Sequence, residues 1–590
     1  MQSRNRTCIM ALGAAMILGA CATEPAHVIP ATPAERLAAI RPVTQAMMQE
    51  PAAGDWMQLG RSYDGQNFSP LTSINRTNVK NLAPAWRAPL AAGLSMPSLL
   101  VHDGVMFLHT APDTVLALDA VTGQEMWRNT YKPEGGSSMK MGLGLGGSHV
   151  FAPTSDLHVI AIDARTGATA WNHKIELSAP ATNRSFFNLR SAPLVVGDKV
   201  IQGVTASAGP GGGFIVALDI ATGKEIWRFH RLARPGAPGG NTWNDLSLEK
   251  RTGGSVWHQG TFDPELNLVY FGAAPTYDTA GLLKPSTAPG VTNDALYTNA
   301  TIALDPDTGQ LKWHYQHLPN DQWDLDWAFE RTLATVRFEG RNRKVVMNVG
   351  KIGVLDALDA ATGAYLFSID AGTQNMITAI DPKTGRKTID PQRYPDPTRP
   401  TIYCPSPSGA RAWPPTSFSP TTGMLYLPLT EWCAKMGNDG SSLLSAPGAR
   451  ISEADHPDAV ADGKMGLLQA MDVSGGKRAW RRDLDAPIST SALATAGGVV
   501  FIGDLDPALK AFDDRDGALL WTAPLDANPN SVLATYSVGP TQYVAVVTGM
   551  ANYHIGAMAP RYQRFRASQG LPPIAPPKGE PSIQVFALSK

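Results

Sequence analysis

The chain has little charge of either sign for its length. Of its 590 residues only 17% are charged, and 50 basic side chains face 51 acidic ones, for a net charge of −1. Without a basic field, nucleic acid is not an expected partner. Glycine (56) and proline (47) are plentiful instead, which is typical of many short strands joined by turns rather than of long surface helices.

Cysteine is also scarce, and no Cys-x-x-Cys-His signature for attached haem occurs. Two of the four cysteines lie near the N-terminus, where Arg4 and Arg6 precede the apolar run "CIMALGAAMILGA" (8–20). Because this run is too short for a permanent membrane span, residues 1–20 are predicted to be a signal peptide. The alternative is a plain secretory signal in which Cys21 has no role of its own.

The signal ends in "LGAC" (18–21), which resembles a bacterial lipobox. That resemblance implies cleavage before Cys21 and lipidation of its thiol. Ala22 follows, and an aspartate there would indicate inner-membrane retention, so the outer membrane is favoured. We therefore predict a lipid-anchored protein on the periplasmic side of the bacterial envelope. In that oxidising compartment Cys404 and Cys433 are expected to form a disulfide, the alternative being two separate buried thiols.

Residues 21–54, rich in Ala, Pro and Thr, are predicted to be a tether. After Asp55 the chain repeats itself: "ALDAVTGQEMW" (117–127) recurs as "AIDARTGATAW" (161–171), "ALDIATGKEIW" (217–227) and "ALDPDTGQLKW" (303–313), with weaker copies at 357–367, 470–480 and 511–521. Each copy predicts a strand end, a turn that Asp caps and Gly closes with positive φ, and a strand carrying an aromatic residue.

Eight aromatic positions result when "LAPAW" (82–86) is included, and they are expected to be core residues that dock the repeats. They are Trp86, Trp127, Trp171, Trp227, Trp313, Phe367, Trp480 and Trp521. The first lacks an "ALD" partner, which is found at the C-terminus in "SIQVFALSK" (582–590). This split repeat predicts an all-β, eight-bladed propeller over residues 55–590, with a ring closed by N- and C-terminal strands. Long insertions at 239–298 and about 370–420 are the expected location of a site.

These segments, in this order and spacing, resemble the quinoprotein alcohol dehydrogenases, which hold pyrroloquinoline quinone (PQQ) and usually Ca²⁺ at the centre of the ring. "DWMQLGRSYDGQNFSPLTSINRTNVKNLAPAW" (55–86), "GGSVWHQGTFDPELNLVYFG" (253–272) and "WHYQHLPNDQWDLD" (313–326) carry the resemblance. "YCPSPSGARAWPP" (403–415) with Cys433 resembles a family disulfide region.

The resemblance assigns roles to single residues. Asp324, in "QWDLD", falls on the catalytic aspartate, which also contributes to the metal site, and Lys351, in "VGKIG", falls on the cation that contacts the quinone oxygens. Trp257 falls on the aromatic floor beneath the cofactor. Further cofactor contacts are implied for Ser255, Thr154 and Trp413. From the residues alone, Asp324 can also be a turn carboxylate, and Asp321 and Asp326 are interpreted as turn or solvent residues.

The departures from the family are equally specific. An adjacent-cysteine pair falls on Gly135 and Gly136, an arginine on Met141, a metal-binding glutamate near Ala208, and asparagines on Pro275 and Ala412. The usual Ca²⁺ cage is therefore in doubt, with Tyr277, Asp278 or Asn293 as conceivable substitutes.

Two hypotheses follow. The first is a PQQ-dependent dehydrogenase that oxidises an alcohol and, lacking its own haem, passes electrons to a separate acceptor such as a cytochrome c. The second is a non-catalytic propeller scaffold that has lost the cofactor site. Asp324, Lys351 and Trp257 favour the first, and the missing family residues favour the second.

Overall fold

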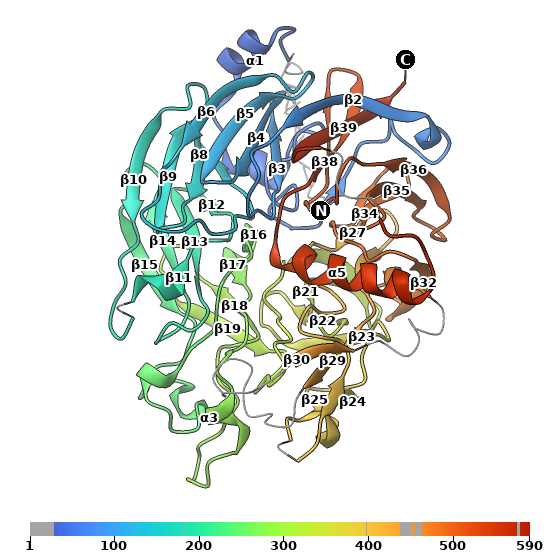
Figure 1. Ribbon diagram of the computed structural model, residues 1–590. Coiled ribbons are helices and arrows are strands. Elements are labelled where there is room, and N and C mark those ends of the chain that lie inside the picture. The colour runs from blue at the N-terminus through green and yellow to red at the C-terminus, as the bar shows by residue number, and fades with distance from the viewer. Residues whose placement is uncertain are drawn as a thin grey trace, which may run out of the picture.

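A computed structural model describes residues 29–181, 183–396, 398–436, 451–454, 463–574 and 579–589. The predicted signal peptide and the predicted lipidation site, Cys21, lie outside the described residues. Within them, eight four-stranded antiparallel sheets stand around a ring (Figure 1), so the predicted eight-bladed propeller is confirmed. The strands of the first four blades are β3–β6 (Leu99–His102, Val105–Thr110, Thr114–Asp119, Glu125–Thr130), β7–β10 (Gly144–Gly146, His149–Pro153, His158–Asp163, Thr169–Lys174), β12–β15 (Leu194–Val196, Lys199–Ala206, Phe214–Asp219, Glu225–His230) and β16–β19 (Thr261–Asp263, Leu268–Phe271, Ala300–Leu304, Leu311–Gln316).

The remaining blades complete the ring. Their strands are β20–β23 (Thr332–Phe338, Arg341–Val349, Val354–Asp359, Tyr365–Asp370), β27, β28, β31 and β32 (Ser417–Ser419, Met424–Thr430, Gly466–Asp472, Lys477–Leu484), β33–β36 (Leu493–Thr495, Val499–Asp504, Ala508–Asp513, Leu519–Pro524) and β37, β38, β39 and β2 (Ala534–Val538, Thr541–Thr548, Ser582–Leu588, Leu82–Pro89). Two short strands pair at blade edges: β1 (Phe68–Ser69) and β11 (Phe187–Asn188).

The last blade joins the two ends of the folded chain. Strand β2 pairs with β39 in antiparallel register, with Leu82 opposite Leu588, although the two residues are 506 positions apart in sequence. Figure 1 shows the blue and red ends of the chain side by side in this sheet. Edge strands that would otherwise be exposed are thereby paired.

The repeated turns link each blade to the next. In the first copy, the Asp119 carboxylate accepts hydrogen bonds from the amides of Val121 and Thr122 at 3.0 and 2.8 Å. Gly123 follows with φ of 74°, and a Cβ there would lie 2.5 Å from the Trp86 ring. The Trp86 indole donates to the Ala120 carbonyl at 3.2 Å. Glycine is therefore required both by the backbone and by the ring that packs on it.

The same contact recurs around the ring. Among the described residues, an indole N–H reaches a turn carbonyl of the following blade from Trp86, Trp127, Trp171, Trp227, Trp313 and Trp480. Phe367 has no N–H, and Trp521 packs edge-on against Phe586 in the closing strand at 5.6 Å.

The segment before the ring differs from the predicted tether. Helices α1 (Pro33–Ala39) and α2 (Gln45–Gln49) lie in it, and its described residues pack on the ring. The Arg36 guanidinium pairs with the buried Asp119 of a blade turn, and Val43 forms a β-bridge with Gly147. Residues 29–54 are therefore docked on the first blades because buried ion pairs and backbone bridges hold them there. No helix among the described residues has the length and apolarity to cross a bilayer.

Segments outside the blade strands carry further elements. They contain α3 (Ala280–Leu283), the hairpin of β24 (Ile377–Ile380) and β25 (Lys387–Ile389), the sheet of β26 (Thr401–Tyr403), β29 (Cys433–Met436) and β30 (Ile451–Ala454), α5 (Tyr553–Ser568), and the 3₁₀ turns Val79–Asn81, Arg184–Phe186, Gly240–Thr242, Leu248–Lys250 and Pro391–Arg393. Helix α5, which the sequence analysis did not predict, lies across the ring (Figure 1).

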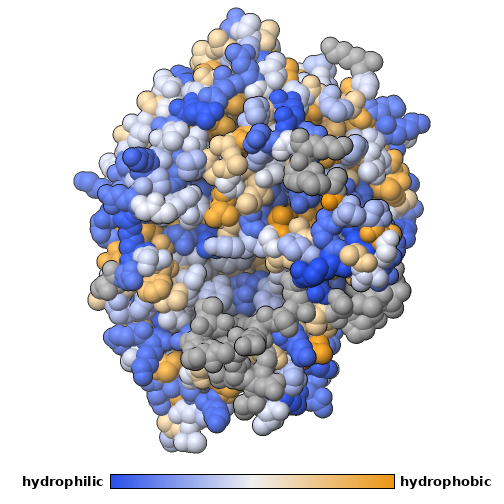
Figure 2. All heavy atoms as spheres, viewed as in Figure 1, coloured by the Kyte–Doolittle hydropathy of each residue, from blue (hydrophilic) through white to orange (hydrophobic). Residues whose placement is uncertain are grey.

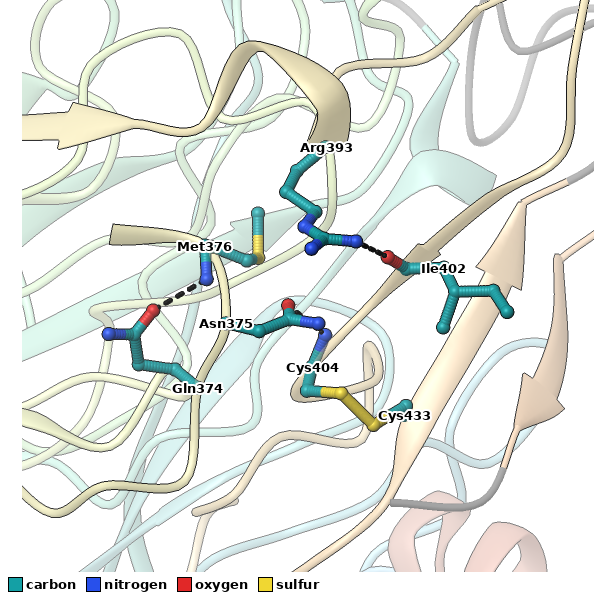
Figure 3. Close-up of a disulfide and its surroundings, with 7 residues drawn as sticks. All are labelled: Gln374, Asn375, Met376, Arg393, Ile402, Cys404 and Cys433. Carbon is teal, nitrogen blue, oxygen red and sulfur yellow. Dashed lines mark hydrogen bonds between the residues drawn. A yellow bond between two sulfur atoms is a disulfide. The ribbon is translucent and has the colours of Figure 1, made fainter. Parts of the chain in front are cut away.

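The predicted disulfide is confirmed. Cys404 and Cys433 are bonded, with 29 positions between them in sequence, and tie the insertion before β27 to β29. Figure 3 shows its surroundings: the Cys404 amide donates to the Asn375 side chain at 2.9 Å, and Arg393 donates to the Ile402 carbonyl at 2.9 Å. The bond therefore anchors the insertion shortly before it reaches Pro407, Ser408 and Trp413.

Replacing both cysteines with serine should lower the free energy of unfolding by about 3 kcal/mol, because the closed loop no longer limits the unfolded chain. The measurement is denaturant unfolding of the two proteins, with reduced wild-type protein as the control. Equal midpoints for the variant and the oxidised wild type would contradict the prediction.

Candidate active site

A cavity of about 360 Å³ opens on the face of the ring that carries α5, and the space-filling view shows a hollow near the middle of this face (Figure 2). Its volume lies at the lower end of the range of about 300–1,000 Å³ common for small-molecule sites. Its lining residues come from blade ends and insertions: Met96, Met139, Arg190, Thr205, Ser207, Trp257, Tyr277, Asp324, Asp326, Phe329, Lys351, Pro407, Ser408, Ala412, Trp413, Tyr553, His554 and Ala557.

The stretch "NDQWDLDWAFE" (320–330) forms one wall and is a buried loop. The Asp321 carboxylate accepts hydrogen bonds from the amides of Trp323 and Leu325 at 2.8 and 2.7 Å, and from the Asn299 side chain at 2.8 Å. Asp321 is thus a turn residue, as predicted, and burial raises its pKa to about 6. Trp323 and Trp327 are fully buried, so the loop is held by packing on both sides of Asp324.

Lys351 lies between two carboxylates. Its ammonium is 3.2 Å from Asp324 Oδ2 and 2.5 Å from Asp326 Oδ2, and it donates to the Asp324 carbonyl at 2.9 Å. The interpretation of Asp326 as a turn or solvent residue is therefore wrong: its side chain is only 4% exposed because the buried ammonium requires a buried counter-charge.

Asp324 differs from Asp326 in access and in backbone conformation. Its side chain is 23% exposed and its φ is 63°, a left-handed conformation that strains residues other than glycine. Burial raises the pKa of Asp324 well above its ordinary value; Lys351 opposes the rise, and the nearby Asp326 adds to it. Although burial alone would lower the pKa of Lys351, the two carboxylates raise it, so the ammonium stays charged.

Aromatic side chains form the opposing walls. Trp257 is held edge-on by Phe329, with ring centroids 5.4 Å apart, and Trp413 is almost fully buried. Four residues that line the cavity also carry a buried polar atom without a hydrogen-bond partner: Thr205 Oγ1, Asp324 Oδ1, Asp326 Oδ1 and Trp413 Nε1. Because buried polar atoms are normally paired, these atoms indicate a polar occupant, and the flat indoles suit an aromatic one. Thr205 and Trp413 can donate to the oxygens of a planar quinone that carries carboxylates, whereas the two aspartate oxygens can accept from a hydroxyl group.

The structure therefore brings Asp324, Lys351, Trp257 and Trp413 together in one cavity. It does not bring in Ser255 or Thr154. The Ser255 hydroxyl accepts a hydrogen bond from the Ala206 amide at 3.0 Å, and the Thr154 hydroxyl donates to Asp156 at 2.6 Å. Both hydroxyls are used in local backbone and turn contacts and lie outside the lining.

Several lining residues escaped the sequence analysis. Arg190, Thr205 and Ser207 stand in blade strands or loops without a motif of their own. His554, to which the sequence assigned no role, lies in the first turn of α5, where burial and the nearby Lys351 lower its pKa to about 3.

The positions that depart from the family do not provide a cage for a divalent cation. Ca²⁺ takes about six to eight oxygen ligands, but Ala208 is exposed, Pro275 has no side-chain oxygen, and the two cavity carboxylates already share the Lys351 ammonium. Of the conceivable substitutes only Tyr277 lines the cavity, and burial keeps its pKa well above the usual value. The Asn293 side chain donates to the Leu282 carbonyl at 2.7 Å within its own insertion.

One other cluster of possible metal ligands occurs among the described residues: Asp55, His102 and Asp103. Its members are bonded within the protein, since His102 Nδ1 lies 2.9 Å from Asp55 Oδ2 and Arg41 donates to both Asp103 oxygens at 2.7 and 3.0 Å. These contacts fasten the N-terminal segment to the ring, and the cluster is structural.

The chain matches known proteins over most of its length. The family profile described as "PQQ: Glucose/ethanol/alcohol dehydrogenase, beta-propeller domain" matches residues 56–375 and 458–544. A quinohemoprotein alcohol dehydrogenase of Pseudomonas putida is 33% identical over 545 residues, which cover 88% of this chain and 77% of that protein. The 1-butanol dehydrogenase (cytochrome c) of Thauera butanivorans is 31% identical over 535 residues, covering 84% and 75%.

Solved structures of related enzymes are also similar to this chain. The quinohemoprotein alcohol dehydrogenase of Comamonas testosteroni superposes with a TM-score of 0.78 at 26% identity, covering 94% of this chain and 84% of that one. A europium-containing methanol dehydrogenase gives a TM-score of 0.80 at 26% identity, covering 91% and 99%.

Replacing Lys351 with methionine should destabilise the protein by about 3–5 kcal/mol at neutral pH, because two buried carboxylates lose their counter-charge. Without Lys351, burial keeps the pKa of Asp324 in the folded state above its unfolded value of about 4. The destabilisation is therefore fully present above the folded-state pKa and fades as the pH falls through it toward about 4, where the unfolded chain also begins to take up the proton.

Denaturant unfolding at neutral pH and at pH near 4 measures both values. The control is Lys312→Met, which breaks a more exposed pair with Asp305 and should lower stability by less than about 1 kcal/mol at either pH. An equal loss at both pH values for the Lys351 variant would count against the charge-based explanation.

Proposed function

Because the chain belongs to the PQQ-dependent alcohol dehydrogenase family, we propose that it oxidises an alcohol group in the central cavity, with Asp324 as the base. The observation that carries the proposal is the arrangement of Asp324, Lys351 and Asp326 beside Trp257 in a cavity whose lining includes unpaired buried polar atoms. When bound, PQQ supplies the acceptor for the hydride that leaves the carbinol carbon.

Asp324 suits the task of taking the hydroxyl proton. Oδ2 contacts Lys351, and Oδ1 is buried without a hydrogen-bond partner, so Oδ2 is held in place and Oδ1 keeps its capacity to accept a proton. A general base works best with a pKa near the operating pH, and the raised pKa of Asp324 moves this carboxyl in that direction. Asp326 is less exposed and serves to hold the ammonium.

The other lining residues orient and shield. Trp257, fixed by Phe329, offers a flat surface for an aromatic cofactor. Helix α5 contributes Tyr553, His554 and Ala557 to the rim, which limits the entry of water. The positive charge of Lys351 would stabilise the negative charge that develops on a quinone oxygen during reduction.

The reduced cofactor must pass its electrons on. The sequence contains no Cys-x-x-Cys-His signature, and a relative is named as a cytochrome c-linked 1-butanol dehydrogenase. We therefore propose a separate cytochrome c as the acceptor. The signal-like segment ending at Cys21 and the Cys404–Cys433 disulfide support a lipid-anchored protein in the periplasm, with the outer membrane favoured.

The scaffold hypothesis has less support. Family membership favours an enzyme, and a scaffold has no need for two buried carboxylates and an ammonium at its centre, because apolar residues of similar volume are often as stabilising or more so.

Titration of the apoprotein with PQQ, followed by a dye-linked alcohol oxidation assay, tests the function. Asp324→Asn should bind PQQ with near-normal affinity and lose about a hundred- to ten-thousandfold in turnover, the usual cost of losing a general base. Asp326→Asn is the matched control, because it removes the other carboxylate bonded to Lys351 and should retain more activity. Failure of the wild-type protein to bind PQQ would contradict the proposed function. Full turnover by the Asp324 variant would show that Asp324 is not the base.

Removal of divalent cations should not weaken PQQ binding, because Lys351 occupies the space between the carboxylates. The dissociation constant for PQQ should be the same in chelator and in millimolar Ca²⁺, and elemental analysis of the PQQ-loaded protein should find no stoichiometric metal. One bound ion for each chain, lost in Asp326→Asn, would show that a metal displaces the lysine.

A further inference from the structure

Arg190 is a cation of the cavity to which no role has been assigned. It lines the cavity from the segment before β12, and its Nε donates to the Asn188 side chain at 3.0 Å. The Tyr553 ring of α5 lies 5.6 Å away and covers the guanidinium. Among the described residues no carboxylate lies within ion-pair distance of Arg190, although Asp326 is close enough to act on it through the field. The two side chains in contact with the guanidinium, Asn188 and Tyr553, are neutral.

A partly buried guanidinium without a carboxylate is uncommon, because removing a cation from water is unfavourable unless an anion or several acceptors compensate. The other two cavity charges are not available, since both carboxylates of the wall contact Lys351. Arg190 therefore has unused donors that face the same space as the unpaired atoms of Thr205 and Trp413. A ligand carboxylate would satisfy them, and guanidinium matches carboxylate geometry with two parallel hydrogen bonds.

The position of Arg190 agrees with what the sequence resemblance implies for this part of the chain. The arginine expected from the family falls on Met141, which is fully buried in an apolar cluster. The Met141 amide donates to the Arg190 carbonyl at 2.9 Å, so the two residues are neighbours on adjacent segments. An arginine is therefore present on the segment that is hydrogen-bonded to the one where the resemblance leads us to expect it.

We infer that Arg190 binds a carboxylate of the quinone cofactor and replaces, from the adjacent segment, the arginine missing at position 141. This inference rests on the proposed function, because it requires PQQ as the occupant. Lys351 and Arg190 then act on different parts of the cofactor: the lysine lies beside the base, and the arginine holds an acidic substituent under the rim formed by α5.

The test compares PQQ with its trimethyl ester, which has the same ring system without carboxylate charge. Quenching of tryptophan fluorescence gives dissociation constants for the apoprotein and for Arg190→Met. The variant should bind PQQ roughly ten- to one-hundredfold more weakly, as expected for a lost charge-assisted hydrogen bond. It should bind the ester as well as the wild type does, because no carboxylate remains to recognise.

Two further variants make the result specific. Arg190→Lys keeps the charge without the fork and should bind PQQ with intermediate affinity. Arg228→Met removes an arginine that stacks on Phe214 at 4.4 Å in an outer strand, and should bind both ligands as the wild type does. Circular dichroism and melting temperatures confirm that each variant is folded.

The outcomes separate the two claims. If the wild type does not bind PQQ, the proposed function and this inference both fall. If the wild type binds and Arg190→Met has unchanged affinity, or loses affinity for acid and ester alike, Arg190 does not recognise a carboxylate of the cofactor and only the inference falls. A variant with normal PQQ affinity but a raised KM for a hydroxycarboxylic acid, relative to an uncharged alcohol, would assign the guanidinium to the substrate and would likewise overturn the inference.

Discussion

The docking of each blade on the next is the interaction on which the rest of the structure depends. In every strong repeat an aspartate caps the turn, a glycine adopts positive φ, and the tryptophan of the preceding blade packs on that glycine. A side chain on the glycine would collide with the ring, and loss of the indole would leave a turn carbonyl unpaired. The contact thus fixes the spacing of the blades, and the ring in turn fixes the ends of the strands from which the cavity insertions start.

At the centre of the ring a different constraint applies, because charge is taken out of water. Lys351 is the only cation in contact with Asp324 and Asp326 among the described residues, and it also binds the Asp324 carbonyl. One ammonium therefore positions Asp324, the proposed base, holds the backbone of its loop and limits the rise of its pKa. In a cage of oxygen ligands a metal ion would perform these tasks; here the chain supplies the charge itself, at a position that a substrate or cofactor can approach from one side.

The sequence predicted what is periodic or adjacent. The tryptophan turns gave eight blades because each repeat carries its own turn chemistry. The disulfide was predicted because Cys404 and Cys433 are the two cysteines that remain after the signal-like segment, in an oxidising compartment. Asp324, Lys351, Trp257 and Trp413 were found through family resemblance, since no local pattern distinguishes Asp324 from the turn residue Asp321. Thr154 and Ser255 matched by position, yet the blade backbone uses their hydroxyls. No sequence pattern predicts the cavity position of Arg190 or of α5, because only the fold brings residues 190, 324 and 553 to one cavity.

The losses and gains in the cavity form pairs, and this bears on whether the site is remodelled or decayed. Met141 stands where an arginine is expected, and Arg190 is bonded to it through the backbone. Ala208 and Pro275 provide no side-chain ligands for a metal. The Lys351 ammonium instead neutralises the Asp324 and Asp326 carboxylates and contacts both. In a site without an occupant, the unpartnered Oδ1 atoms of Asp324 and Asp326 and the Arg190 guanidinium would only destabilise the fold, and apolar substitutions would relieve that cost. Their presence in one cavity is the arrangement expected of a site that still binds a ligand through a changed set of contacts.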